Sequence, residues 1–191
     1  DLLPETAQSK GDWTGVTLNH VSDMATGNFA VRSPMADADP GGFYYDSDRA
    51  HKLDAAFNSP NAEPPGKVFI YQTADTFIQV AAMDAFLRLK GMPDSFEYLV
   101  ERIYRPLGVQ PDVLFTRRTS DDGVINSGTA FGGMGLFWTI DSAVKIARFM
   151  MGDGKIEDRQ VVHPAALDAT MQRDPNDRGM DTEFYNYLYN N

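Results

Sequence analysis

The feature that most constrains the fold is an uninterrupted helical periodicity over residues 73–90. Its apolar side chains cover most of the helix circumference, which is typical of a helix buried on most of its surface. These side chains are Phe77, Ile78, Ala81, Ala82, Ala85, Phe86 and Leu89. Thr73 is the expected N-cap, and Gly91 is the expected left-handed residue after the helix. The sequence therefore predicts a central helix on which shorter elements pack.

A turn and a short apolar segment lead into this helix. Pro65 and Gly66 form the turn, because proline fixes φ and glycine permits a left-handed residue. The apolar residues 68–70 follow and end at Tyr71. A tyrosine before a helix N-terminus lies in a field that favours the phenolate, which suits a general acid or base. The alternative interpretation is a core tyrosine with a satisfied hydroxyl.

Five further segments combine helical periodicity with start or stop signals, at residues 17–27, 47–57, 94–105, 139–151 and 164–172. Thr17 and Thr139 are expected N-caps, and Asp94 with Glu97 resembles a capping box. In the fourth of these helices the inward residues are expected to be Ala143, Val144, Ala147, Met150 and Met151. Residues 28–45 and 112–127 are expected to be loops, and residues 160–162 a short strand. His20 is interpreted as a buried or capping histidine rather than a catalytic one.

Composition excludes several classes of function. The 27 acidic and 17 basic residues give a net charge of −10, which argues against nucleic-acid binding. The absence of cysteine excludes disulfides, thiolate zinc sites and a cysteine nucleophile. The three histidines are far apart in the sequence, and no stretch is apolar enough to span a membrane. We therefore expect no metal ion, no cofactor, no nucleic-acid partner and no membrane span.

The glycine-rich segment 128–139 could suggest a phosphate-binding loop. It lacks the lysine of a Walker loop and the glycine spacing of a dinucleotide site. We expect the glycines to allow close backbone packing before a helix instead. The chain begins at Asp1 without an initiator methionine or a signal peptide, and we expect it to be a piece of a longer protein.

Five segments occur in the order found in a known family. They are residues 3–21 with Trp-Thr-Gly-Val, residues 24–27, residues 64–73, residues 103–109 with Pro-Leu-Gly, and residues 132–141 with Gly-Gly. Together they resemble the serine hydrolases of the β-lactamase and penicillin-binding-protein fold. The resemblance is strongest to the class C-like group with esterases, D-amino-acid peptidases and 6-aminohexanoate-oligomer hydrolases. It implies that residues 1–191 are a single, mainly α domain, the helical region of the α/β β-lactamase-like (DD-peptidase) fold with few short strands.

The resemblance also assigns roles to three residues. Tyr71 matches the motif tyrosine, which acts with a lysine to activate the nucleophilic serine and to protonate the leaving group. Thr73 matches the position where the family has a substrate-contacting asparagine or serine, and Gln72 lies at the variable position between them. A free phenol has a pKa of about 10, so such a base needs a nearby cation or helix dipole.

The nucleophile of the family is the serine of a Ser-x-x-Lys motif. The single match here, Ser142 with Lys145, falls in the helix after the Gly-Gly segment, and we interpret it as a decoy. The family places its nucleophile upstream of Asp1, and its Lys-Thr-Gly or His-x-Gly strand beyond Asn191. This chain alone is therefore expected to be inactive.

Two hypotheses follow about function. In the first, the chain is part of a serine hydrolase that acts through an acyl-enzyme on ester, amide or β-lactam carbonyls of small-molecule or peptide-like substrates. In the second, it is a non-catalytic homologue or a helical module that binds peptides or partners. Substrate identity, oligomeric state and localisation stay open at this point.

Overall fold

The computed structural model describes residues 2–4, 11–28, 43–44, 46–59, 63–109, 115–176, 178–182 and 188–189. The helices are α1 (Leu18–Ser22), α2 (Arg49–Phe57), α3 (Thr73–Leu89), α4 (Ser95–Leu99), the π-helix η3 (Val100–Tyr104), α5 (Ile140–Met151) and α6 (Pro164–Thr170). The strands are β1 (Phe115–Thr116), β2 (Leu136–Phe137), β3 (Lys155–Ile156), β4 (Arg159–Gln160), β5 (Met180–Asp181) and β6 (Leu188–Tyr189). They form three antiparallel pairs, β1–β2, β3–β4 and β5–β6. The predicted mainly α fold with few short strands is confirmed.

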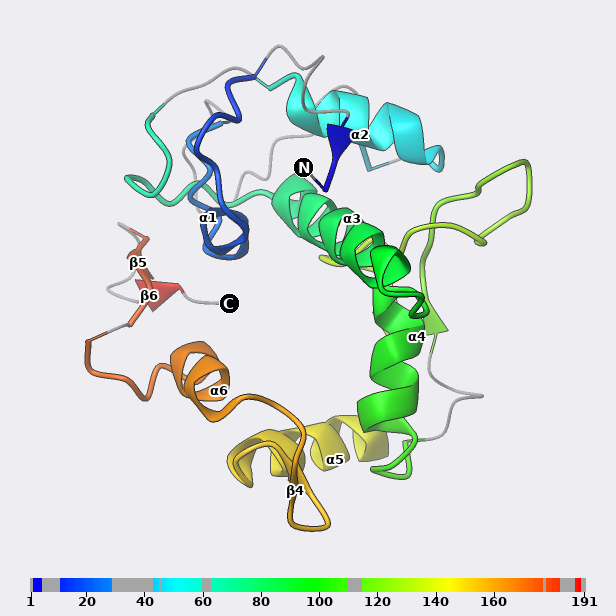
Figure 1. Ribbon diagram of the computed structural model, residues 1–191, viewed down its shortest axis with the longest axis vertical. Coiled ribbons are helices and arrows are strands. Elements are labelled where there is room, and N and C mark those ends of the chain that lie inside the picture. Colours follow the sequence, from blue (N-terminus) through cyan, green and yellow to red (C-terminus); the bar gives the residue numbers. More distant parts are fainter. Residues whose placement is uncertain are drawn as a thin grey trace.

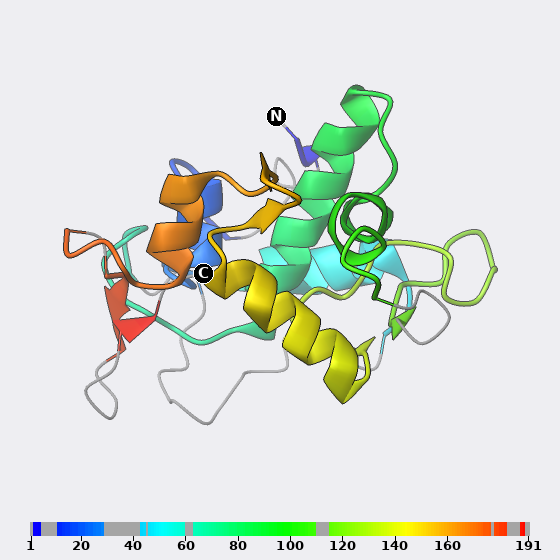
Figure 2. The same ribbon diagram turned by 90° about the horizontal axis from the view of Figure 1, so that it is seen from below.

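The longest helix, α3, lies where two groups of helices meet. It packs on α1 and α2 at one side and on α4 at the other. Figure 1 shows α4 leading down from α3 toward α5, with α6 and the β5–β6 pair completing the arc. Figure 2 shows the chain from below, with α5 and the β3–β4 hairpin in front of α3. No helix within the described ranges is both long enough and apolar enough to cross a membrane.

The main hydrophobic core surrounds the first half of α3. Phe77 is fully buried, and the rings of Phe43 and Phe131 lie edge-on to it, with centroids 5.7 and 6.2 Å away. The fully buried Lys52 places Nζ 3.6 Å from the Phe43 ring centroid and 4.0 Å from that of Phe131. This ammonium also donates a hydrogen bond to the carbonyl of Phe43. Cation–π attraction and a hydrogen bond thus compensate part of the desolvation of a buried charge.

Most predicted helix starts are confirmed by their caps. Thr17 Oγ1 accepts from the N–H of His20, and His20 Nδ1 accepts from the N–H of Thr17, so His20 is a capping histidine. Thr139 Oγ1 accepts from the N–H of Ser142. Asp94 accepts from the N–H of Glu97 at the start of α4. Local side-chain chemistry decides where these helices begin.

Two expectations need correction, and a third is not tested. Thr73 is not the N-cap of α3: Gln72 is, without a side-chain capping bond, and Thr73 is the first helical residue. The strand predicted at 160–162 is instead β4 at Arg159–Gln160, which pairs with β3 across a tight turn, and residues 161–162 lie beyond it. The loop predicted at residues 28–45 lies largely outside the described residues.

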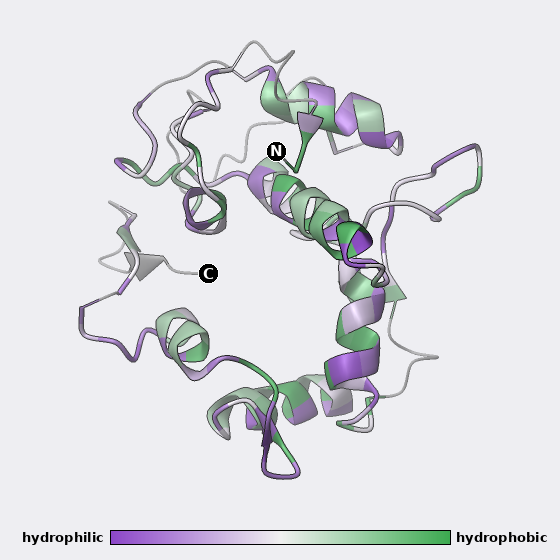
Figure 3. Cartoon of the chain, in the orientation of Figure 1, coloured by the Kyte–Doolittle hydropathy of each residue, from purple (hydrophilic) through white to green (hydrophobic). Residues whose placement is uncertain are grey.

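The inward face predicted for α5 is partly wrong. Val144 is 43% exposed, Met151 is 72% exposed, and Ala147 is exposed as well, whereas Phe149 is buried. Figure 3 shows hydrophobic residues on both α3 and α5. The apolar periodicity of α5 is real, but the described residues leave part of that face uncovered.

Candidate functional site

Tyr71 lies immediately before α3. The N–H of Ile70 donates to the carbonyl of Met24 at 2.9 Å, which fixes the backbone just ahead of the tyrosine. Tyr71 is 36% exposed, while Gln72 and Thr73 on either side of the helix start are buried. The first turn of an α-helix carries unsatisfied N–H groups and a partial positive charge. Tyr71 is thus an accessible phenol whose backbone lies two residues before the first residue of α3.

Gln72 is fully buried next to this tyrosine. Its Oε1 and Nε2 atoms have no hydrogen-bond partner within the described part of the chain. An unpaired buried amide destabilises a fold by about 1–3 kcal/mol, so such a group is unusual. Thr73 is 6% exposed, and its carbonyl accepts from Thr76 Oγ1 at 2.7 Å. The three predicted site residues are thus consecutive, but only Tyr71 faces solvent.

The predicted close packing of the Gly-Gly segment is confirmed, and its partner is the first turn of α3. A Cβ atom on Gly133 would lie 2.2 Å from Thr76 Oγ1 and 2.9 Å from Thr73 Cγ2. Gly132 has φ +76°, and a Cβ there would lie 2.7 Å from the carbonyl oxygen of Thr76. Only glycine allows the two backbone segments to approach this closely.

The Ser-x-x-Lys match within α5 does not form a reactive pair in the structure. Ser142 is buried and its Oγ lies 3.0 Å from Thr139 Oγ1. Lys145 Nζ lies 2.7 Å from Asp141 Oδ2 and donates to the carbonyl of Gly108 at 2.7 Å. The lysine is therefore engaged away from the serine, in agreement with the interpretation as a decoy.

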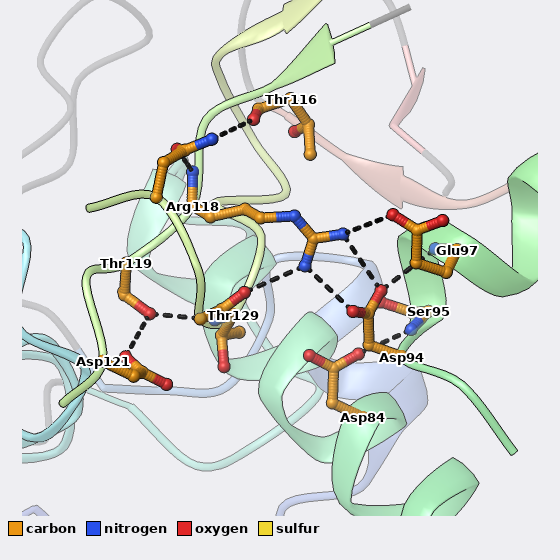
Figure 4. Close-up of polar contacts among 11 residues, drawn as sticks. Asp84, Asp94, Ser95, Glu97, Thr116, Arg118, Thr119, Asp121 and Thr129 are labelled. Atoms are coloured by element: carbon orange, nitrogen blue, oxygen red, sulfur yellow. Dashed lines mark hydrogen bonds and ion pairs between the residues drawn. The ribbon is translucent and has the colours of Figure 1, made fainter. Parts of the chain in front are cut away.

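A cluster around Arg118 was not predicted from the sequence. Figure 4 shows its guanidinium group pointing at the carboxylates of Asp94 and Glu97 at the start of α4. It donates to Asp94 Oδ2 at 3.0 Å, to Asp94 Oδ1 at 3.2 Å, to Glu97 Oε1 at 3.3 Å and to the carbonyl of Gly128 at 2.9 Å. Burial raises the pKa of Asp94, but hydrogen bonds from Arg118 and from the N–H of Glu97 outweigh it and hold this pKa below 3.8. The cluster attaches the loop before β2 to α4.

An apolar pocket of about 210 Å³ lies between η3, α5 and α6. Its lining includes Leu99, Tyr104, Phe149 and Leu167. Burial raises the pKa of Tyr104 above its ordinary value of 10.0. A second apolar pocket, of about 360 Å³, lies beside α1 and includes Trp13. Neither pocket includes Tyr71, and the described residues contain no cluster of three or more His, Asp or Glu side chains that could hold a metal ion.

No family model matches the sequence, and no curated protein matches it. Solved structures do match. A protein assigned as a 6-aminohexanoate-dimer hydrolase from Bacillus anthracis is 14% identical with a TM-score of 0.62, and the match covers 92% of this chain and 46% of that one. A protein assigned as a β-lactamase from Bacteroides dorei DSM 17855 is 19% identical with a TM-score of 0.54, covering 82% of this chain and 42% of that one.

A third match is the octameric penicillin-binding protein homologue from Pyrococcus abyssi, 13% identical with a TM-score of 0.54. It covers 81% of this chain and 38% of that one. The chain thus spans less than half the length of each of these three structures. At these identities the likeness establishes the fold, and the resemblance found in the sequence is confirmed at that level. The chain has the mainly helical part of the fold shared by β-lactamase-like and penicillin-binding-protein-like hydrolases.

Proposed function

We propose that this chain is the helical part of a serine hydrolase that cleaves ester, amide or β-lactam carbonyls through an acyl-enzyme. The nucleophilic Ser-x-x-Lys would lie in the protein outside residues 1–191. The observation that carries the proposal is the placement of an accessible Tyr71 at the start of α3, in a chain whose fold matches part of known hydrolase structures. The substrate would be a small-molecule or peptide-like carbonyl compound.

In this proposal Tyr71 is the general acid and base. With the lysine of the complete site it would accept the proton of the nucleophilic serine and then deliver a proton to the leaving group. In this proposal the chain alone does not cleave the scissile carbon–oxygen or carbon–nitrogen bond of a substrate, because the nucleophilic serine would lie outside residues 1–191.

Thr73 and Gln72 take supporting roles in the proposal. Thr73 matches the substrate-contacting position of the family, so its hydroxyl would contact substrate once the first turn of α3, where Thr73 is 6% exposed here, becomes accessible. Gln72 would contact substrate only after its buried amide becomes accessible, since it is 0% exposed here. Replacement of Thr73 by valine, which keeps the shape and removes the hydroxyl, is therefore expected to raise KM more than it lowers kcat.

The experiment uses the complete protein that contains this chain. A fluorophosphonate probe is expected to label one serine, and mass spectrometry should map it to a Ser-x-x-Lys outside residues 1–191. Hydrolysis of p-nitrophenyl butyrate, nitrocefin and 6-aminohexanoate dimer then identifies the carbonyl class. Tyr71→Phe is expected to lower kcat by about 10²-fold or more. Tyr98→Phe, on the neighbouring helix α4, is the matched control and should retain wild-type turnover.

Two outcomes contradict the proposal. Labelling of Ser142 or another serine of this chain would mean that the nucleophile has been misplaced. Absence of both labelling and hydrolysis would favour the second hypothesis, a non-catalytic module that binds peptides or partners. Full turnover by Tyr71→Phe would remove this tyrosine from the mechanism while leaving the hydrolase assignment intact.

A further inference from the structure

The backbone that carries Tyr71 is held on one side by a buried segment. Ile70 donates to the carbonyl of Met24 at 2.9 Å, and Gly66 donates to that of Ala25 at 2.7 Å. Met24 and Ala25 are both buried in the core. These two bonds fix the approach to α3 before the tyrosine is reached.

The first turn of α3 is held on its other side by the Gly-Gly segment. The contact is so close that a methyl group on Gly133 would lie 2.2 Å from Thr76 Oγ1. That hydroxyl in turn donates to the carbonyl of Thr73 at 2.7 Å. Thr76 therefore cannot move away from Gly133 without breaking a bond inside the turn that follows Tyr71.

The Gly-Gly segment is itself anchored in the core. Phe131 is 1% exposed, and its N–H donates to the carbonyl of Arg117 at 2.9 Å. Its ring lies edge-on to Phe77, one turn along the same helix α3. Both sides of the Gly133–Thr76 contact are thus tied to one rigid core, and neither gives way easily.

We propose that Gly133 is a positioning residue for Tyr71 and that it acts through Thr76. The inference rests on the proposed function, because it concerns the placement of the proposed acid–base group. A group that transfers protons must be held within about 0.5 Å of its productive position. The absence of a side chain at Gly133 lets the first turn of α3 sit where it places the phenol correctly.

Gly133→Ala in the complete protein tests the proposal. The added methyl must push the first turn of α3 aside, and a misplacement of about 1 Å can lower turnover about 10²-fold. We expect kcat to fall by about 10- to 100-fold with little change in KM. Thr76→Ala removes the hydroxyl that the methyl would meet, so the double variant is expected to recover part of the lost kcat.

Gly128→Ala is the matched control. A Cβ on Gly128 would also lie 2.2 Å from a threonine hydroxyl oxygen, that of Thr119, but in the loop beside Arg118 rather than on α3. Like Gly133, Gly128 does not have a positive φ. Gly128→Ala should lose at least as much thermal stability as Gly133→Ala, because a Cβ there would also lie 2.3 Å from Asp121 Oδ1, whereas only Gly133→Ala should lose kcat. An equal loss of kcat in both would mean general destabilisation and would overturn the inference.

A double-mutant cycle with Tyr71→Phe separates positioning from other effects. If Gly133 acts through the phenol, Gly133→Ala should have almost no further effect on kcat once the hydroxyl is gone. The same fold loss in both backgrounds would overturn the inference. Full turnover by Tyr71→Phe would instead overturn the proposed role of the tyrosine, so the two failures are distinguishable.

A variant without the added methyl covers the case in which Gly133→Ala does not fold. Thr76→Val replaces the hydroxyl at the same contact by a methyl group and breaks the bond to Thr73. It is expected to lower kcat in the same direction. Wild-type kcat in Thr76→Val would then count against the inference.

Discussion

The Arg118 cluster offers the sharpest test of how the helical region is held together. Arg118→Ala removes four hydrogen bonds at once, three to the carboxylates of Asp94 and Glu97 and one to the carbonyl of Gly128. The Arg118 side chain is only 11% exposed, and that of Asp94 is 33% exposed. The substitution leaves a half-buried carboxylate without its cation, which is a known route to a large loss of stability.

The magnitude follows from these exposures. The bidentate contact with Asp94 is partly buried and is worth about 2 kcal/mol, at the lower end for charge-assisted bonds. The neutral carbonyl of Gly128 adds about 1 kcal/mol, and the exposed bridge to Glu97 adds little. A loss of about 3 kcal/mol lowers Tm by about 6–12 °C for a chain of this size.

Thermal and urea unfolding at pH 7 measure this loss. Arg118→Lys should recover only part of it, because an ammonium group cannot make the bidentate contact. Arg102→Ala is the control: Arg102 is exposed and stacks on Tyr98 with 5.6 Å to the ring centroid, so its removal should change stability by less than about 1 kcal/mol. A loss below about 1 kcal/mol in Arg118→Ala would refute the estimate.

The pH dependence gives an independent check on the same cluster. The pKa of Asp94 in the folded protein lies below its ordinary value of 3.8. Its stabilisation is therefore fully present above pH 3.8 and is lost as the pH falls through the folded-state pKa. The stability difference between wild type and Arg118→Ala should shrink in that acidic range. A difference that persisted undiminished at pH 2 would contradict the assignment to Asp94.

Three further predictions concern single residues. Gln72→Met should keep or raise Tm, because it removes an unpaired buried amide. A lower Tm would show that the amide has a partner, and a fall in kcat would show that the amide serves catalysis. Tyr104 should ionise above pH 10 in an absorbance titration, because burial raises its pKa, and Tyr104→Phe should remove that late step. The stabilisation linked to this raised pKa is fully present below pH 10 and is lost as the pH rises through the folded-state pKa. Thr139→Ala should lower stability by about 1 kcal/mol through loss of the N-cap of α5, and Thr139→Ser should restore it; equal stability of both variants would exclude the cap.

The sequence predicted helix positions well because the signals that begin and end helices are local. Thr17, Asp94 and Thr139 each accept a bond from an N–H three residues later, and that spacing is visible in the sequence. Thr73 misled the prediction because Gln72, an uncommon capping residue, occupies the N-cap without a side-chain bond. Propensity ranks residue types, but the approach of the backbone from residue 70 decided this helix start.

Side-chain partners far apart in the sequence were beyond prediction. Nothing in the sequence near Arg118 indicates that it pairs with Asp94, because the contact depends on how the loop before β2 returns to α4. The same holds for Lys52, an apparently ordinary helix lysine that is fully buried among aromatic rings. On α5 the periodicity marked the apolar residues correctly. It does not say which of them other elements cover, and Val144 and Met151 are exposed.

The candidate site shows how the two kinds of information combine. The sequence resemblance identified Tyr71 and the Gly-Gly segment as separate family features, and neither suggested that the glycines pack on the helix turn that follows the tyrosine. The structure brings the glycines onto the first turn of α3, where the space left by a missing Cβ is filled by Thr76. The side chain of Tyr71 does not occupy that space, because it is 36% exposed at the surface. If Gly133 positions Tyr71 as we propose, it does so through the backbone that leads into α3, and the placement of the tyrosine then depends on a glycine more than sixty residues away in the sequence.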